Sequence, residues 1–413
     1  MAFSPTARRT LVTARTIGLA AQTLLRPIAL VSLYALLGII VLFYTLRAYA
    51  TIVHAPHTDA LWDFKLFYSG VLDFFTGGSR YKPSAALPCP RTSTSPNNNS
   101  PVGSLIFLPL SRLPLPLAAA LWEGGSLILL LLAITYIWRE VAPPRQWRWR
   151  IVLLAGIYVS FPVVDALSLG TWGMLIAFLD VLAWYYIRKG AQRRAGILLG
   201  VALVLRWQPL TLLLYMIMQR RWRVVTSTFM TAAICCGLAF LVFGLRSFIE
   251  FASLVLRSSH GVSGDPYDGS LCAELIRLVH AVAPDDPHLA SIVSQIGLLG
   301  ALCLLGVTLW RCWVVSFDQG FSLCITCGLL ITPMSWTHYH MALLLPLAIV
   351  AQQRRWPVLC VGIIWLSNTL LPFHLDAHPF WYGTAATASL LVVYGSLWIK
   401  RQSPRPTSNA GQC

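Results

Sequence analysis

Charged side chains are scarce in this chain: they make up 11% of its 413 residues, whereas hydrophobic residues make up 57%. An average soluble domain carries about 25% charged residues, and a water-exposed surface cannot be covered with so few of them. The composition therefore excludes an ordinary soluble protein. It predicts a chain that lies in a lipid bilayer over most of its length.

Acidic residues are scarcer still, with 15 Asp and Glu against 31 Lys and Arg and a formal net charge of +16. In a soluble domain such an excess of basic residues is typical of nucleic-acid binding. Here the basic residues lie in short clusters between apolar runs rather than on one domain. We therefore expect no nucleic-acid partner.

The apolar runs predict an all-α integral membrane protein. A bilayer core about 30 Å thick needs roughly 20 apolar residues in a helix, and shorter runs indicate half-length elements. We expect a bundle of about 10 to 12 transmembrane or half-length helices. The runs lie near residues 28–48, 117–137, 151–163, 172–187, 195–205, 209–218, 224–244, 292–313, 321–332, 341–351, 357–371 and 382–399.

Two of these regions predict helical hairpins made of half-length helices. The region 195–218 is interrupted at Pro209, and the region 321–351 is interrupted between Pro333 and His340. Proline removes a helical hydrogen bond and disfavours helix at the residue before it. Each region should therefore turn inside the bundle rather than cross the membrane once.

Lysine and arginine are absent from three short connections, at residues 164–171, 333–340 and 372–381. Most of the 31 basic residues lie at the opposite ends of the helices that these connections join. Because loops rich in Lys and Arg stay on the cytoplasmic side, we expect the three connections to face outward. The protein is then a multi-pass protein of the plasma (inner) membrane.

The N-terminal segment, residues 1–27, contains no signal-peptide cleavage pattern, and we expect it to be a cytoplasmic arm. A membrane domain over residues 28–400 should follow, with long outer loops at 49–116 and 245–291, and then a cytoplasmic tail at 401–413. In the first outer loop, apolar residues recur at helical spacing between positions 64 and 75. This spacing predicts an amphipathic helix at the membrane interface.

The same orientation separates the titratable residues. All nine histidines and all carboxylates except Glu140, Asp180 and Asp318 fall on the outer side or at outer helix ends. Groups able to do acid–base chemistry therefore gather on one face, where we expect the active site.

The cysteines do not indicate a redox or metal centre. Cys324 and Cys327 have a redox spacing but lie inside an apolar run without basic neighbours, which favours plain packing. Cys89 and Cys272 lie in the outer loops, where an oxidising compartment would allow them to pair.

Asp63 directly precedes the apolar pattern of the interfacial helix. One interpretation is a helix N-cap. The other is a general base at membrane-surface depth, which takes a proton from a hydroxyl while a lipid-linked donor stays in the bilayer. Asp59 is the neighbouring alternative.

Arg206 is a charged residue at the outer end of the hairpin at 195–218. A guanidinium there is costly unless it is paired. It either reaches lipid headgroups or binds a phosphate through its planar set of donors.

His338 and His340 lie in the break between the last two half-length helices. They are either interfacial side chains with polar tips or hydrogen-bond partners of a phosphate or sugar hydroxyl. A metal site that adds His374 and His378 is disfavoured, because Pro379 interrupts their helical spacing and no cluster of acidic ligands is nearby. We expect neither a metal nor a cofactor.

The order of these motifs resembles glycosyltransferase family 87, a group within the GT-C superfamily that was formerly a domain of unknown function. The resemblance covers roughly residues 28–400. It rests on Asp63-Phe64-x-x-Phe67-Tyr68 with Gly77 and Tyr81, then Arg206-x-x-Pro209 ahead of Arg220-Arg221-Trp222, then Thr332-Pro333-x-Ser335-Trp336-x-His338-Tyr339.

The resemblance implies a multi-spanning enzyme whose site faces outward. The donor would be a polyprenyl-phosphate-linked sugar, most often mannose, and the acceptor a lipid or glycan hydroxyl. Carried over, Asp63 is the catalytic base, Arg206 contacts the donor phosphate, and His338 assists at the phosphate or the acceptor. Further substrate contacts are expected among Asp59, Lys65, Tyr68, Asp268, Trp336, Tyr339 and His340.

Two departures from the family pattern leave the sugar and the acceptor open. The chain reads Gly170-Thr171-Trp172-Gly173 where the family tends to show Gly-Gln-x-Asn, and Asp268-Gly269-Ser270 where it often has Asn-x-Ser. The main alternative function is a transporter or flippase, which paired broken helices would suit. Against it, the acidic residues gather on one face and only Asp180 lies deep.

Overall fold

The structure, a computed structural model, describes residues 60–82, 97, 99–141, 147–258, 265–282, 287–370 and 380–399, together with single positions between 31 and 50. The chain divides into two compact units, one made of residues 1–47 and 144–159 and the other of residues 48–143 and 160–413. The smaller unit contains α5 (Trp147–Tyr158). The predicted helix at 28–48 lies largely outside the described residues.

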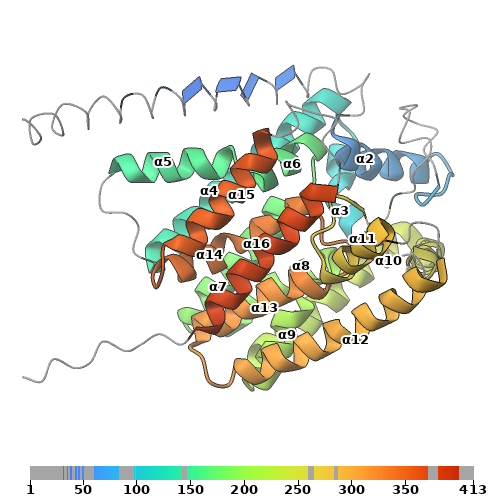
Figure 1. The fold of residues 1–413 in the computed structure, drawn as a ribbon. Helices are drawn as coiled ribbons and strands as arrows, with labels where there is room; N and C mark the ends of the chain where they lie inside the picture. The colour runs from blue at the N-terminus through green and yellow to red at the C-terminus, as the bar shows by residue number, and fades with distance from the viewer. Residues whose placement is uncertain are drawn as a thin grey trace, which may run out of the picture. The chain divides into compact units, whose positions relative to one another are not determined.

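Most helices of the larger unit follow the predicted apolar runs, whereas the helices Trp62–Phe75, Pro101–Leu110 and Leu271–Val282 lie within the two expected outer loops (Figure 1). The helices of this unit are α2 (Trp62–Phe75), α3 (Pro101–Leu110), α4 (Leu115–Glu140), α6 (Phe161–Leu169), α7 (Gly173–Arg188), α8 (Gln192–Leu205), α9 (Leu210–Met218), α10 (Trp222–Ser258), α11 (Leu271–Val282), α12 (Pro287–Arg311), α13 (Phe317–Ile331), the 3₁₀ helix η2 (Thr337–Leu343), α14 (Leu344–Ala351), α15 (Trp356–Leu370) and α16 (Phe380–Trp398).

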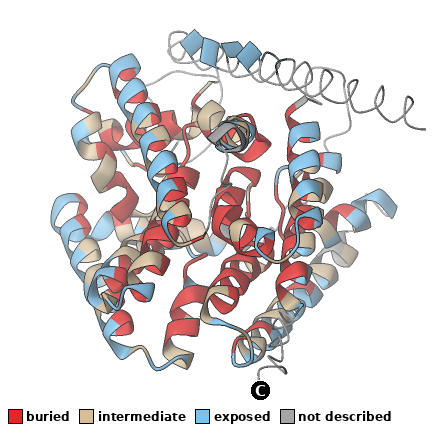
Figure 2. Cartoon of the chain, turned by 90° about the vertical axis from the view of Figure 1, so that its left-hand side faces the viewer, coloured by how far each residue is buried: buried red, intermediate tan, exposed pale blue. Residues whose placement is uncertain are grey.

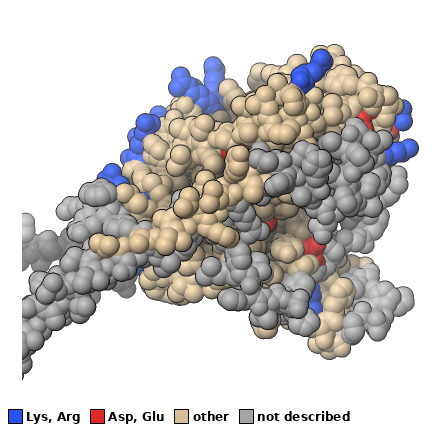
Figure 3. Space-filling model, turned by 90° about the horizontal axis from the view of Figure 1, so that it is seen from above, with Lys and Arg blue, Asp and Glu red and all other residues tan. Residues whose placement is uncertain are grey.

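The all-α membrane architecture is confirmed. Within the described part of the chain, three helices are long and apolar enough to cross a bilayer alone, namely Leu115–Glu140, Trp222–Leu256 and Ile292–Arg311. The last two of these spans expose large apolar side chains such as Leu241, which is 80% exposed, and Trp310. Figure 2 shows helices that combine buried and exposed residues, and most of the described surface on the face seen in Figure 3 carries no charge. Such a surface is stable in lipid rather than in water.

Both predicted breaks are present. Helix α8 ends at Leu205, Arg206 is extended, and α9 begins at Leu210. Helix α13 ends at Ile331, and η2 begins at Thr337. Arg206 therefore lies in a backbone break that proline enforces.

Two expected loops are partly helical. Residues 161–169 form α6, where a short outer connection at 164–171 was expected, because Pro162 suits the first turn of a helix and Gly170 ends it in the left-handed region. Helix α10 continues to Ser258, beyond the expected loop start at 245, and bends at Gly244, whose φ is 69°. An apolar run that stops at residue 244 therefore marks a bend rather than the end of the helix.

The predicted helix in the first outer loop is α2, but it does not lie with one face open. Residues 64–71 are buried on every side, and even Lys65 is only 1% exposed. The rings of Phe64 and Phe67 pack on Phe107, and Phe67 stacks on Trp172 at 5.1 Å between ring centroids. These aromatic contacts hold α2 against α3 and against Trp172, the residue that precedes α7.

Glycine sets the close approach of α8 to α10. A Cβ at Gly196 would lie 2.4 Å from the carbonyl oxygen of Val224, and one at Gly200 would lie 2.6 Å from that of Thr228. The hydroxyl of Thr228 donates to the carbonyl of Gly196 at 3.1 Å. Small residues four apart let two membrane helices approach backbone to backbone, and this contact fixes the end of α8 that carries Arg206.

Charged residues tie three helices together at the far end of α7. Arg188 bonds Glu140 of α4 at 3.2 Å and Asp318 of α13 at 2.6 Å, and Lys189 bonds Glu140 at 2.6 Å. Two of the three carboxylates that the sequence assigns to the inner side are therefore paired with the basic residues expected there.

Gly170 should be sensitive to substitution. Its φ is 70°, and a Cβ there would lie 2.6 Å from the Cβ of Phe64 on α2. The left-handed backbone costs an alanine about 1 to 2 kcal/mol, and crowding against Phe64 adds about 1 to 3 kcal/mol. We expect Gly170→Ala to lower the thermal unfolding temperature of the detergent-solubilised protein.

Gly190 is the matched control, because its φ is 77° but a Cβ there would meet nothing within 4 Å. Gly190→Ala should lower the unfolding temperature less. Equal shifts for the two variants would mean that the contact between Gly170 and Phe64 contributes nothing.

Candidate functional site

Asp63 lies in the first turn of α2, which is anchored to the end of α6. The N-cap of α2 is Leu61 rather than Asp63, so the capping interpretation of Asp63 does not hold. The backbone N–H of Leu61 donates to the carbonyl of Ser168 at 2.9 Å. The carboxylate of Asp63 forms no hydrogen bond to any residue that the structure describes, and it remains available for a ligand.

His338 is paired with a carboxylate of α6. Its Nδ1 lies 3.3 Å from Oδ2 of Asp165, and the same oxygen accepts a hydrogen bond from the hydroxyl of Thr337 at 2.5 Å. His338 is only 3% exposed, and its Nε2 is buried without a hydrogen-bond partner among the described residues. The imidazole is therefore held from one side and free on the other.

Arg206 reaches the same place from α8. Its guanidinium carbon lies 4.2 Å from the ring centroid of Tyr339, and that ring meets the ring of His338 edge-on at 4.3 Å between centroids. Within the part of the chain that the structure describes, the Nε of Arg206 and the hydroxyl of Tyr339 are buried without hydrogen-bond partners. A cation on an aromatic face with free N–H donors is suited to bind an anion.

These charges act on Asp63, which lies outside the membrane-spanning helices. Burial raises the pKa of the Asp63 carboxyl, the positive charges of His338 and Arg206 oppose that rise, and the negative charge of Asp165 adds to it. The three sequence-predicted residues Asp63, Arg206 and His338 therefore come together, although they lie far apart along the chain.

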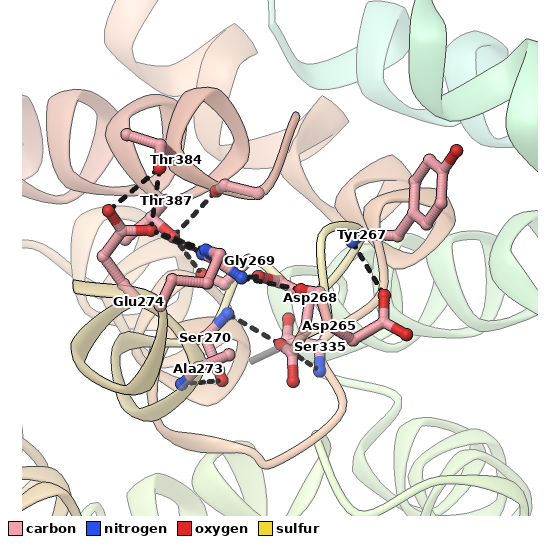
Figure 4. Close-up of polar contacts among 12 residues, drawn as sticks. Asp265, Tyr267, Asp268, Gly269, Ser270, Ala273, Glu274, Ser335, Thr384 and Thr387 are labelled. Atoms are coloured by element: carbon pink, nitrogen blue, oxygen red, sulfur yellow. Dashed lines mark hydrogen bonds and ion pairs between the residues drawn. The ribbon is translucent and has the colours of Figure 1, made fainter. Parts of the chain in front are cut away.

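Two loop segments that lie far apart in the sequence are joined by hydrogen bonds just before η2. The carboxylate of Asp268 accepts hydrogen bonds from the backbone N–H groups of Ser270 at 2.8 Å, Ser335 at 3.0 Å and Met334 at 3.0 Å. Met334 has a φ of 61°, a conformation that non-glycine residues rarely adopt. Asp268 therefore fixes the turn that leads into His338 (Figure 4).

The loop that carries Asp268 is itself held by Arg277 of α11. This guanidinium donates to the carbonyls of Asp265 and Asp268, each at 2.7 Å, and pairs with Glu274 at 2.5 Å. Figure 4 shows Glu274 in turn bound to Thr384 of α16. The sequence analysis did not single out this buried ion pair, and its only sequence signal was an Arg three residues after a Glu on a short helix.

The other residues predicted to contact substrate lie at separate places in the structure. Tyr68 donates its hydroxyl to the carbonyl of Leu113 at 2.7 Å, away from the cluster, and Lys65 is buried within α2. Trp336 pairs with Asp268 in an isolated β-bridge at the N-terminus of η2. Asp59, Cys89, His374 and His378 lie outside the described residues.

His340 and Tyr339 follow His338 in η2, and both are buried. The Nε2 of His340 has no hydrogen-bond partner, and a Cβ at Gly269 would lie 2.7 Å from it. Substrate contacts by these residues, and by Lys65, Tyr68, Trp336 and Asp268, stay predictions.

Two carboxylates near the site were missed by the sequence analysis. Asp165 was within the basic-free connection at 164–171, and that position was its available signal. Glu123 is 6% exposed in α4, and its Oε1 is buried without a partner, 3.3 Å from the Cβ position of Gly170. An isolated acid in a long apolar helix was the signal for Glu123.

A cavity of about 360 Å³ adjoins Arg206. It is walled by α3, α8, α9 and α10, and Arg206 is the only charged residue among its described lining residues. Apolar lining residues include Val102, Val204, Leu210, Cys236, Phe248 and Phe251. Its size is that of a small-molecule site, and its lining suits a hydrocarbon chain whose anionic end meets Arg206.

No group of three or more His, Cys, Asp or Glu side chains suited to hold a metal occurs in the described part of the chain. Among the described residues, the cluster leaves Nε of Arg206 and Nε2 of His338 without hydrogen-bond partners. The guanidinium N–H of Arg206 binds anions rather than cations.

Comparison with known proteins decides the family. The sequence profile of Glycosyltransferase family 87 matches residues 98–335, which is more than half of the chain. The chain belongs to glycosyltransferase family 87. It is an integral membrane glycosyltransferase, and the transporter alternative has no support.

Mycobacterial relatives match much of the chain. A polyprenol-phosphate-mannose-dependent alpha-(1-2)-phosphatidylinositol mannoside mannosyltransferase of Mycobacterium tuberculosis is 24% identical over 392 residues, which cover 86% of this chain and 89% of that protein. A corresponding pentamannoside mannosyltransferase of Mycolicibacterium smegmatis is 25% identical over 251 residues, or 60% of this chain and 58% of that protein. No solved structure matches the chain.

Proposed function

We propose that this family 87 enzyme transfers mannose from polyprenyl-phosphate mannose to a hydroxyl of a lipid or glycan acceptor, with inversion at the anomeric carbon. The observation that carries the proposal is the convergence of Asp63, Arg206 and His338 beside an apolar cavity. The names of the relatives support the donor, because those proteins are polyprenol-phosphate-mannose-dependent.

The chemistry follows from what each group can do. A lipid phosphate is already a good leaving group, so charge stabilisation matters more than a strong general acid. Arg206 and the free Nε2 of His338 face the departing phosphate. Asp63 takes the proton of the acceptor hydroxyl as its oxygen bonds to the anomeric carbon, and the bond from that carbon to the phosphate oxygen breaks on the opposite side.

The raised pKa of Asp63 suits this role. Burial raises the pKa of this carboxyl, which makes it a stronger base than an ordinary aspartate. The positive charges of His338 and Arg206 oppose that rise. A base whose pKa approaches the working pH is the most effective.

The outward position of the site is supported by α7. Gly173, its first residue, meets the backbone of His338, because a Cβ there would lie 2.4 Å from the carbonyl oxygen of His338. Arg188, its last residue, belongs to the basic cluster at the other end. Sixteen residues of helix span about 24 Å. A basic cluster on the cytoplasmic side therefore leaves the site on the outer face.

The first test replaces the base. Asp63→Asn keeps the size of the side chain but removes the proton acceptor, and it should lower kcat by about 100- to 10,000-fold. The measurement is transfer by purified enzyme with polyprenyl-phosphate mannose, compared with the corresponding arabinose and glucose donors. Mannose should be the preferred sugar.

Asp73→Asn is the control, because Asp73 lies ten residues further along the same helix, at about 15 Å. It should keep near-wild-type activity. Full activity of the Asp63→Asn protein would refute the base assignment, and preference for another sugar would refute the choice of mannose.

The second test fills the cavity. Cys236→Trp places a large side chain in the cavity lined by α10 and should raise the KM for a long-chain polyprenyl donor by roughly tenfold, equivalent to about 1.4 kcal/mol. A donor with a short prenyl chain should be affected less. Leu241→Trp, on the lipid-facing side of the same helix, should change neither KM. An equal rise for the two donors would exclude the cavity as the site of the hydrocarbon chain.

The third test uses pH. The positive charge of Arg206 lowers the pKa of Asp63, so Arg206→Gln raises that pKa. Activity requires the carboxylate and is lost as pH falls through its pKa. The acid limb of kcat/KM should therefore move to higher pH, by roughly one unit, and the KM for the donor should rise more than that for the acceptor.

Arg112→Gln, at an exposed arginine between α3 and α4, should leave the acid limb in place. An unchanged acid limb in Arg206→Gln would contradict the electrostatic coupling between Arg206 and Asp63.

A further inference from the structure

Asp165 is a carboxylate of α6 that contacts the imidazole of His338. It lies on α6, one turn before the carbonyl of Ser168 that anchors α2. One of its oxygens, Oδ2, meets both Nδ1 of His338 and the hydroxyl of Thr337. A single carboxylate therefore joins the element that places Asp63 to the element that places His338.

The contact decides which nitrogen of His338 is free. Nδ1 and Nε2 lie on different edges of the imidazole ring, and a carboxylate beside Nδ1 keeps the proton on that nitrogen. Thr337 donates to the same oxygen, which fixes the carboxylate against rotation. Nε2 then points away from Asp165, and it is the nitrogen that is buried without a partner.

Among the described residues, Asp165 is the carboxylate in contact with the His338 ring. Tyr339 covers one edge of the ring with its own ring. The charges of His338 and Arg206 both act on Asp63, but the described residues contain no ion pair between Asp63 and either of them. The orientation of His338 thus depends on Asp165 rather than on Asp63.

We propose that Asp165 is a positioning residue for transfer: it accepts the Nδ1–H of His338 and holds the ring so that, in the imidazolium form, Nε2–H donates to the departing phosphate. The inference rests on the proposed function, in which His338 assists at that phosphate. Asp165 touches neither donor nor acceptor and acts through His338, as the buried aspartate of a hydrolase triad acts through its histidine. Its loss therefore lowers the rate only while His338 is present.

The experiment is a double-mutant cycle on the full-length enzyme in detergent or lipid nanodiscs. Asp165→Asn, His338→Ala and the double variant are compared with the wild type for kcat and for the KM of each substrate, with polyprenyl-phosphate mannose as the donor. We expect Asp165→Asn to lower kcat roughly 10- to 1,000-fold with little change in the KM for the acceptor. In the His338→Ala background the same substitution should change kcat less than about threefold.

Asp180→Asn is the matched control. Asp180 is a buried carboxylate of α7, 3% exposed and seven residues from Gly173, which is about 10 Å along the helix. It should keep kcat within about twofold of the wild type. If Asp165→Asn does not fold, as judged by thermal unfolding, the cycle is run with Asp165→Glu.

The outcomes separate the two proposals. An equal loss of kcat from the Asp165 substitution in both His338 backgrounds means a merely structural role and overturns the inference. The absence of mannose transfer by the wild-type enzyme overturns the proposed function instead. A non-additive cycle in an active enzyme supports both.

Discussion

The docking of the first turn of α2 on the end of α6 is the constraint on which the site depends. Gly170 ends α6 in a left-handed conformation and leaves room for Phe64, and the N–H of Leu61 reaches the carbonyl of Ser168. That approach sets where the first turn of α2, and with it Asp63, lies against the end of α6. A carboxylate is thereby held where the charges of Arg206 and His338 act on it.

Opposite charges meet in the site, where the positive charge of Arg206 acts on the carboxyl of Asp63. Nε of Arg206, Nε2 of His338 and the hydroxyl of Tyr339 have no hydrogen-bond partner among the described residues. Buried donors without partners cost free energy. An anion with several oxygens would satisfy them together, so the unliganded site is arranged in advance for a phosphate, and binding energy is available where charge develops in the reaction.

Sequence reasoning predicted the helices and the three central residues because both signals are local. Apolar runs and proline breaks mark α8 and α9, and a lone charge beside an apolar run marks Arg206. Asp165 could not be ranked above other outer acids, because its role depends on a contact with His338, which is 173 positions away. The burial of Lys65 was equally hidden, since the aromatic residues that cover α2 come from distant helices.

Gly173 and Asp268, which lie where the chain departs from the family pattern, both contact the backbone near η2. Gly173 meets the backbone of His338, and Asp268 has both carboxylate oxygens occupied by backbone N–H groups of its own loop and of the turn before η2. Residues at these positions therefore set how helices and turns fit together around His338. This frame decides how accurately Asp63, Arg206 and His338 meet.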